Sequence, residues 1–257
     1  MKLLEGKVCI VAGAAAPKSI GSATAQLFAE HGANLVIADI SASESTADEF
    51  SRSMADAGLP RPNVRALRCD ISRRADCERM AAKTIEQFGR IDVLVNSAGI
   101  VEARPILEID EEQFDRMIAV NLKGAFNLCQ AALEAFVPQR SGTIVNIASL
   151  AAQRGGGLVG GAHYASAKGG VLSLTRSIAR EFGPQGIRAN AVCPAMAQTG
   201  MIDDLSQAQI DAIIGEIPLR RLGTPREVAG ACLFLASELS GFMTGATVDV
   251  NGGLHIH

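Results

Sequence analysis

The order of short apolar runs and longer amphipathic segments limits the folds open to this chain of 257 residues. Seven runs rich in β-branched residues have the length of buried strands, and segments of helical length with apolar periodicity separate them. Such alternation predicts an α/β fold in which helices cover both faces of a parallel sheet. The expected strands are 8–12, 35–38, 64–67, 93–95, 143–147, 189–192 and 247–250, and the expected helices are 20–31, 46–57, 73–88, 111–136, 163–182 and 225–237.

Composition favours a single domain that spans residues 1–257. The chain is 48% hydrophobic and 20% charged, and no stretch rich in proline, serine or charge marks a boundary. A net charge of −3 gives no general attraction to nucleic acid or to an anionic membrane. No run approaches the roughly 18 apolar residues of a membrane span, and the charged start 1–7 lacks the apolar core of a signal peptide. We therefore expect a cytoplasmic protein whose partners are small molecules.

The cysteines and histidines do not suggest a metal site. Six cysteines form no Cys-x-x-Cys pair and lie mostly within apolar runs, as core thiols do. The chain has four histidines, two of them in the tail 255–257, so a set of metal ligands is hard to assemble. We expect no metal, and the chemistry of any site has to come from other side chains.

The first expected strand runs directly into a glycine-containing turn, residues 12–21, and a helix follows. Such a turn directs backbone N–H groups and a helix N-terminus at an anion, and Gly13 and Gly21 let a pyrophosphate come close. The second strand ends at Asp39, where an acid can accept both hydroxyls of an adenosine ribose. Taken singly, the turn could be an ordinary strand–helix connection and Asp39 a turn or cap residue.

Polar and small residues also end the third and fourth expected strands. Asp70 follows the third strand, and the fourth strand is followed by Asn96, Ser97, Ala98 and Gly99. Either group could form only an Asx turn. Four successive parallel strands with such ends, however, meet at one edge of the sheet, where open α/β folds bind ligands. The sequence therefore predicts a nucleotide site at this edge.

The only tyrosine of the chain, Tyr164, precedes Lys168 by four residues on an expected helix. Side chains at that spacing share a helix face, so the ammonium can favour the ionised phenol. Lowering a phenol pKa from about 10 to near 7 takes roughly 4 kcal/mol, which requires a close cation in an enclosed site. An isolated pair of this kind is more often a surface contact, but the glycine-rich stretch 154–161 just before it is a candidate wall of a site.

Taken in order, these residues resemble the motifs of the short-chain dehydrogenase/reductase family. The resemblance covers essentially the whole chain and implies a doubly wound Rossmann fold with a seven-stranded parallel sheet. It also implies an NAD or NADP cofactor and hydride transfer between the nicotinamide and an alcohol or carbonyl carbon of a small molecule. The matching positions are Gly13, Gly21, Asp39, Asp70, Asn96, Ser97, Ala98, Gly99, Asn121, Ser149, Tyr164, Lys168, Pro194, Thr199, Asn251, Gly252 and Gly253.

The resemblance implies a role for each matching residue. Tyr164 is the implied general acid/base, and Lys168 is implied to lower its pKa and to hold the nicotinamide ribose. Ser149 is implied to hydrogen-bond the substrate oxygen, and Asn121 to hold a helix irregularity and a water that leads from the lysine to solvent. The implied cofactor contacts are Gly13, Ser19, Ile20, Gly21, Asp39, Asp70, Ile71, Asn96, Ala98, Gly99, Tyr164, Lys168, Pro194, Ala197 and Thr199.

The glycine turn departs from the family's usual pattern. Ala12 and Ser19 replace a threonine and a glycine, and the turn is two residues longer than usual. In this it resembles the turn of enoyl-acyl-carrier-protein reductases, which reduce a carbon–carbon double bond. In those relatives the tyrosine and the lysine are further apart, so the spacing of Tyr164 and Lys168 favours carbonyl or alcohol chemistry.

Two other functions remain open. An NADPH-dependent 3-oxoacyl-thioester reductase has the same general layout, and Lys18 could meet a 2′-phosphate there. Asp39 would repel that phosphate, so NAD is the expected cofactor and NADP the less favoured one. A nucleotide-sensing or scaffold protein could also use this fold. A sensor, however, has no need of a tyrosine prepared for proton transfer.

The resemblance also concerns the lid and the assembly. Residues 195–218 take the place of the family's substrate lid, although their apolar side chains could equally pack as core. A homo-oligomer, a tetramer, is implied, with the helices 111–136 and 163–182 at one interface. The apolar candidates for that interface are Phe126, Leu133, Leu172 and Ile178, all of which could instead face the chain's own core.

Overall fold

The computed structural model describes residues 2–59, 61–157, 159–202 and 205–256. Residues 1, 60, 158, 203, 204 and 257 of the predicted domain lie outside this set, and two of them belong to the predicted lid. None of the helices in the described part of the chain has the length and apolar character needed to span a membrane.

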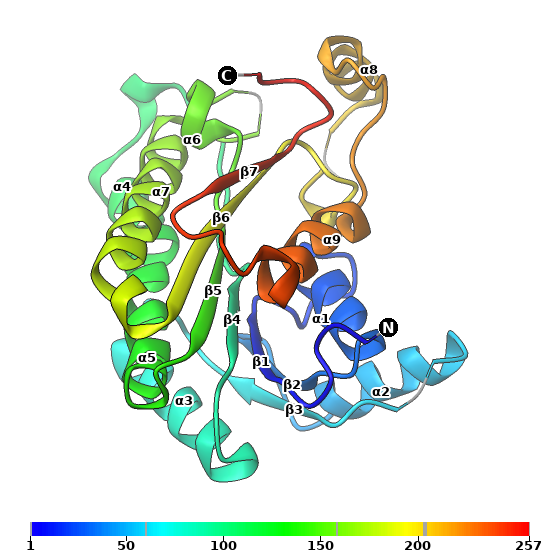
Figure 1. Ribbon diagram of the computed structural model, residues 1–257. Helices are drawn as coiled ribbons and strands as arrows, with labels where there is room; N and C mark the ends of the chain where they lie inside the picture. Colours follow the sequence, from blue (N-terminus) through cyan, green and yellow to red (C-terminus); the bar gives the residue numbers. More distant parts are fainter. Residues whose placement is uncertain (1, 60, 158, 203–204, 257) are drawn as a thin grey trace.

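Seven parallel strands form one sheet in the order β3-β2-β1-β4-β5-β6-β7 (Figure 1). The chain runs outward from β1 to β3, returns to the other side of β1 at β4 and then runs outward again, which is doubly wound topology. The expected α/β fold is confirmed. The strands are β1 (Val8–Ala12), β2 (Asn34–Asp39), β3 (Val64–Arg68), β4 (Val93–Asn96), β5 (Gly142–Ile147), β6 (Ile187–Pro194) and β7 (Thr247–Val250).

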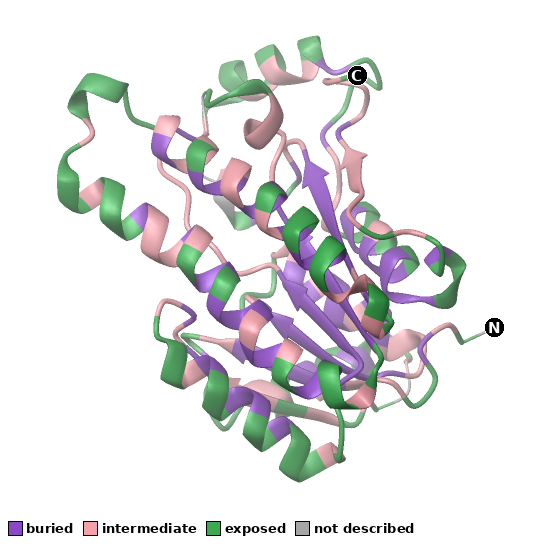
Figure 2. Ribbon diagram, turned by 60° about the vertical axis from the view of Figure 1, so that its left-hand side comes forward, coloured by how far each residue is buried: buried purple, intermediate pink, exposed green. Residues whose placement is uncertain are grey.

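Helices cover both faces of the sheet, and alternate strand residues supply the two cores. Cys9 and Val11 belong to one core, whereas Ile10 between them belongs to the other. Figure 2 shows the buried strands between helices whose outer surfaces are exposed. The first core packs on α1 (Ile20–Glu30), α2 (Thr46–Asp56) and α9 (Pro225–Ala236), and the second on α3 (Arg74–Phe88), α5 (Gly124–Gln139) and α7 (Ala162–Phe182).

The expected helix 111–136 consists of three segments in the structure. It begins as α4 (Glu111–Ile118), widens into the π-helical turn Ala119–Lys123 and continues as α5. Two helices were not expected, α6 (Ala151–Arg154) and α8 (Gln207–Glu216), the second of which lies in the predicted lid. Short 3-10 helices occupy Ile106–Glu108, Gly183–Gln185, Gly200–Ile202 and Glu238–Ser240.

The apolar residues considered for a subunit interface separate into two groups. Leu172 and Ile178 are 6% and 5% exposed, and Leu133 packs against the same core as Ile178, so these three serve the chain's own interior. Phe126 on α5 is 50% exposed, and Phe114 on α4 is 45% exposed. The predicted interface therefore rests on these two phenylalanines.

Candidate active site

The pairing of the strands brings the predicted nucleotide residues to one edge of the sheet. Ala12 at the end of β1 stands level with Ala38 on one side and Asn96 on the other. Beyond this level the Gly13 N–H donates to the carbonyl of Ala38 at 2.8 Å, and the Ser97 N–H donates to the carbonyl of Ala12 at 3.0 Å. The turns after β1, β2 and β4 therefore start side by side.

Glycine is required where the first turn meets its neighbours. Gly13 has a φ of 77°, and a Cβ there would lie 2.6 Å from the Cα of Ala98. A Cβ on Gly21 would overlap the carbonyl oxygen of Gly13. The turn is thus closely packed between β4 and α1, and Ala98 serves as its support.

The N-terminus of α1 has the properties of an anion site. Ser19 is the N-cap, and its Oγ accepts the N–H of Ser22 at 3.0 Å. The N–H groups of Ile20 and Gly21 begin the helix and have no acceptor within it. No acidic residue stands in the first turn, so nothing there offsets the positive end of the helix dipole. This donor set fits a diphosphate.

Asp39, at the end of β2, is held in a fixed orientation. Its Oδ2 accepts the backbone N–H of Ala15 at 3.2 Å, and its Oδ1 accepts the N–H and the hydroxyl of Ser41 at 3.0 and 2.8 Å. The residue is half-buried. A carboxylate has about four lone pairs, and these three contacts leave one on Oδ2 that can accept from a ribose hydroxyl while Asp39 fastens the glycine turn. The residues at this edge therefore fit a dinucleotide.

The residues after β3 divide between the edge and the core. Oδ1 of Asp70 accepts the N–H and the hydroxyl of Ser72 at 3.0 and 2.7 Å, which is an Asx turn. Ile71 is 6% exposed, packs its side chain against Gly124, and its carbonyl accepts from Asn127 at 2.9 Å. Ile71 can therefore offer a nucleotide little more than its backbone.

Asn96 ends β4 inside the sheet. Its Nδ2 donates to Oδ1 of Asn146 at 3.3 Å, and Asn146 in turn donates to Oγ1 of Thr175 at 3.0 Å. Oδ1 of Asn96 is buried and has no hydrogen-bond partner among the described residues. Asn96 thus ties β4 to β5 and α7 beneath the edge.

The expected helix irregularity lies at Asn121, inside the π-helical turn Ala119–Lys123. The Nδ2 of Asn121 donates to the carbonyl of Ile100 at 2.9 Å and to that of Met117 at 3.3 Å, and its Oδ1 accepts the N–H of Ile100 at 3.2 Å. A Cβ on Gly99 would lie 2.5 Å from this Oδ1 and 3.4 Å from Nζ of Lys168. Gly99, Asn121 and Lys168 therefore pack together.

Lys168 is buried, at 5% exposure, and faces the end of β5. Its Nζ donates to the carbonyl of Ile147 at 2.9 Å and lies 5.9 Å from the centre of the Tyr164 ring. Burial lowers the pKa of Lys168 to about 8. Ile147 was not among the predicted site residues, although its place two residues before Ser149 at a strand end was a usable signal.

The structure brings Tyr164 and Ser149 together. The pKa of Tyr164, however, is raised in the structure, whereas Lys168 was expected to lower it. Burial raises the pKa of Tyr164, and a hydrogen bond with the Ser149 side chain offsets part of that rise. The ammonium of Lys168 is turned to the Ile147 carbonyl, so it does not outweigh the burial. Cys193, fully buried at the end of β6, also borders this group, and its pKa is raised to about 11 by burial.

The start of the predicted lid lies beside the Ser149 region and beside the glycine turn. The carbonyl of Pro194 accepts the Leu150 N–H at 2.9 Å, next to Ser149. Ala197 forms a bridge with Gly223, and Thr199 follows, largely buried. The Gly200 N–H then donates to the carbonyl of Lys18 at 3.2 Å. Pro194 is therefore near Ser149, and Gly200 is near the glycine turn.

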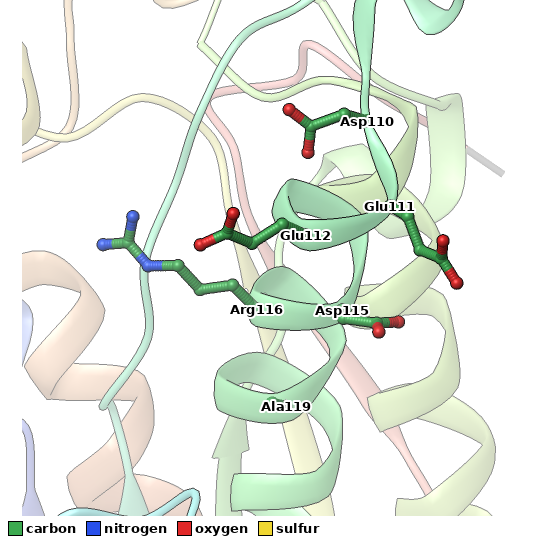
Figure 3. A pocket seen from close by; sticks show the side chains of 6 residues that line it. All are labelled: Asp110, Glu111, Glu112, Asp115, Arg116 and Ala119. Carbon is green, nitrogen blue, oxygen red and sulfur yellow. The ribbon is translucent and has the colours of Figure 1, made fainter.

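A separate hollow on α4 does not fit a dinucleotide. Figure 3 shows Glu112 and Arg116 extending to one side of the helix and Glu111 and Asp115 to the other, with Asp110 at its start. The carboxylates outnumber the single arginine and would repel phosphates. Among the described residues, no group of three or more His, Cys, Asp or Glu side chains is placed to hold a metal ion.

Comparisons with known proteins agree with this geometry. The family described as enoyl-(acyl carrier protein) reductase matches residues 13–255. An uncharacterised short-chain type dehydrogenase/reductase of Sinorhizobium fredii is 44% identical over 99% of this chain and 100% of its own length. A 3-oxoacyl-(acyl-carrier-protein) reductase of Thermotoga maritima is 39% identical over 98% of this chain and 99% of its own length.

The fold has a solved counterpart over its full length. The crystal structure of a short-chain dehydrogenase/reductase, a glucose/ribitol dehydrogenase type from Brucella melitensis, matches with a TM-score of 0.88 at 37% identity and covers 100% of both chains. Relatives at this identity and coverage share the fold. The chain belongs to the short-chain dehydrogenase/reductase family.

Proposed function

We propose that Tyr164, with Ser149 and Lys168 beside it, carries out proton transfer in the interconversion of a secondary alcohol and a ketone. As a member of its family, the protein is an NAD(P)-dependent oxidoreductase. The observation that carries the proposal is the meeting of the buried Lys168, the Ser149 hydrogen bond and the phenol at the same sheet edge as the dinucleotide residues. The nicotinamide, when bound, supplies or accepts the hydride.

The side chains divide the work by their chemistry. The phenol of Tyr164 donates its proton to the carbonyl oxygen of the substrate, and the Ser149 hydroxyl donates a hydrogen bond to the same oxygen. A raised pKa keeps this phenol protonated at neutral pH, which suits reduction. In the oxidation of an alcohol, the phenolate removes the proton, and Lys168 is the nearby cation that stabilises it.

NAD is the proposed cofactor. The N-terminus of α1 would hold the diphosphate, Asp39 the ribose hydroxyls of the adenosine, and Lys168 the ribose of the nicotinamide. Asp39 supports this choice because its carboxylate is oriented by Ala15 and Ser41 and would face a 2′-phosphate of NADP with a like charge.

A 3-oxoacyl-thioester reductase that uses NADPH is the second candidate. The name of the Thermotoga maritima relative, at 39% identity, favours a 3-oxoacyl group on a carrier protein as substrate. Lys18 supports NADPH because it belongs to the glycine turn. A β-keto thioester is also a ketone, so both candidates use the same acid and differ in cofactor and substrate length.

The lid and the assembly complete the proposal. Residues 195–218 would close over the substrate, since they follow Pro194 beside Leu150 and reach the glycine turn through Gly200. The protein would be a homotetramer that acts on small molecules. A sensor or scaffold that only binds the nucleotide is the non-enzymatic alternative, and measured turnover excludes it.

The test is a panel of secondary alcohols, ketones and 3-oxoacyl thioesters assayed in both directions with NAD(H) and NADP(H). We expect turnover by the wild-type protein and a loss of about 100- to 10,000-fold in Tyr164→Phe, which removes one oxygen and keeps the ring. Nucleotide binding, measured by quenching or enhancement of NADH fluorescence, is expected to persist in the variant. Near-wild-type turnover by Tyr164→Phe would show that the acid has been assigned wrongly.

A further inference from the structure

The glycine-rich stretch before Tyr164 comes closest to the phenol ring at Gly160. A Cβ built on Gly160 would overlap Cδ1 of Tyr164 and would lie 3.1 Å from both Cε1 and Cγ. The backbone of Gly160 is therefore in direct contact with one edge of the ring. Gly160 is buried, whereas Gly157 in the same stretch is exposed, and no atom of the described residues lies within 4 Å of its Cβ position.

Backbone conformation does not explain the glycine at position 160. The glycines with φ in the left-handed region include Gly155 but neither Gly157 nor Gly160. A positive φ therefore does not bar an alanine at 157 or at 160. The space taken by the Tyr164 ring is thus what excludes a side chain at 160.

The stretch is anchored on both sides of this contact. The Gly161 N–H donates to the carbonyl of Glu102 at 2.8 Å, and the Gly157 N–H donates to the carbonyl of Gly160 at 2.7 Å. On the other side, Arg154 donates to the carbonyl of Leu254 at 3.1 Å. Since these bonds restrain the backbone of Gly160, the tyrosine ring is the softer partner if the two are forced apart.

We infer that Gly160 is a positioning residue for the phenol, holding the ring so that its hydroxyl meets Ser149 and the substrate oxygen. The inference rests on the proposed role of Tyr164 as the acid/base. A methyl group at 160 tilts the ring and moves the hydroxyl at its far end. A displacement of about 1 Å at a reacting group can cost on the order of 100-fold in rate.

The experiment compares Gly160→Ala with Gly157→Ala in the full chain, using a ketone that is turned over in the panel above. Gly160→Ala is expected to lower kcat by about 10- to 100-fold and to leave the Kd for NADH within about twofold of wild type. Gly157→Ala is expected to match the wild type, because its methyl group enters open space and its N–H is kept. Equal activity of the two variants would overturn the inference.

A double-mutant cycle shows whether Gly160 acts through the phenol. In the Tyr164→Phe background, Gly160→Ala is expected to cause no further loss. A further loss of 10- to 100-fold there would mean that the methyl group acts elsewhere, and the inference would fail.

Spectroscopy supplies a readout that does not need turnover. The chain has one tyrosine and no tryptophan, so its tyrosinate absorbance and its tyrosine fluorescence report on Tyr164 alone. Gly160→Ala is expected to shift the pH titration of this signal, and Gly157→Ala is not. If Tyr164→Phe kept its turnover, the proposed function would fall while this titration still decided whether Gly160 controls the ring.

A second variant covers the case in which Gly160→Ala does not fold. A Cβ on Gly156 would lie 2.5 Å from the carbonyl oxygen of Gly160 and would displace position 160 indirectly. Gly156→Ala is therefore expected to lower kcat and to shift the tyrosine titration, each by less than Gly160→Ala. A wild-type titration and kcat in Gly156→Ala, with Gly160→Ala unfolded, would count against the inference.

Discussion

The carboxylate of Asp39 accepts the backbone N–H of Ala15 at 3.2 Å, so the acid at the end of β2 also fastens the turn that would hold the diphosphate. Its two tasks can be separated by substitution. Asn removes the charge and keeps an oxygen that accepts the Ala15 N–H. Ser removes the charge, and its side chain is too short to accept the Ala15 N–H.

Replacing Asp39 with Ser or with Asn is predicted to raise the ratio of kcat/KM for NADP over NAD by tenfold or more. The wild-type charge would stand about 4 Å from a 2′-phosphate, and removing that repulsion is worth on the order of 1 to 4 kcal/mol. Asp39→Ser should in addition weaken the binding of both nucleotides, because the glycine turn loses the hydrogen bond from the Ala15 N–H to residue 39. If the wild type prefers NADP and Lys18→Ala abolishes that preference, the lengthened turn governs the choice instead.

Lys168 is predicted to make the protein's stability rise with pH. In the folded chain its pKa is about 8, below the usual 10.5, so between these values the unfolded chain binds a proton that the folded chain has released. Stability from this group is therefore gained as pH rises from 8 to 10.5. Below pH 8 the buried ammonium destabilises the folded chain by on the order of 3 kcal/mol relative to high pH.

Urea unfolding at pH 7 and pH 10.5 checks this prediction. The free energy of unfolding of Lys168→Met, relative to that of the wild type, should be higher at pH 7 than at pH 10.5, because methionine avoids the burial of a charge. Lys83→Met, which removes an amine from the exposed side of α3, is the control. A difference between wild type and Lys168→Met that stayed constant with pH would contradict the burial of a titrating amine.

Gly99→Ala is predicted to lower both stability and turnover. Its Cβ would lie 2.5 Å from Oδ1 of Asn121 and 3.4 Å from Nζ of Lys168, and such overpacking costs about 1–3 kcal/mol. Gly230→Ala, in the exposed face of α9 with nothing within 4 Å, should instead stabilise the chain by about 0.5–1 kcal/mol. If the packing around Lys168 is as described, thermal unfolding will show a lower Tm for Gly99→Ala and a higher Tm for Gly230→Ala than for the wild type.

The tetramer is predicted to depend on Phe126. This side chain is 50% exposed on α5, and a charge in place of it would be buried between subunits. Light scattering of the wild type should give about four times 26.8 kDa, and Phe126→Asp a smaller mass. Ile85→Asp, at a 40% exposed position on α3, is the control and should leave the mass unchanged. A wild-type mass near that of one chain at micromolar concentration would refute the assembly.

The strands and helix caps could be predicted because local chemistry decides them. β1 and β7 have the expected bounds, since β1 is an apolar run and β7 holds β-branched residues in three of its four positions. The sequence Thr224-Pro225-Arg226-Glu227 predicts a helix start, and α9 does begin there with a capping box. The same signal, Ser206 with Gln209, stands before α8, a helix within the segment that was expected only as a lid.

The parts of the site that the sequence analysis missed depend on tertiary packing. The π-helical turn leaves the apolar pattern of 111–136 nearly continuous, so its position could come only from the resemblance at Asn121. The direction of the Tyr164 pKa depends on how deeply the ring is buried and on where the Lys168 ammonium points. Neither quantity can be read from a spacing of four residues.

The contacts before the glycine-rich stretch also bear on the order in which the molecule folds. Gln153 donates to Asp249 across 96 residues, and Arg154 donates to Leu254 across 100. Contacts that close such long loops form slowly, whereas Ala15 in the turn after β1 and Asp39 at the end of β2 are 24 residues apart. We therefore expect the residues proposed to hold the adenosine end of the nucleotide to take their places early in folding, and the wall beside Tyr164 to reach its final form only after β7 has joined the sheet.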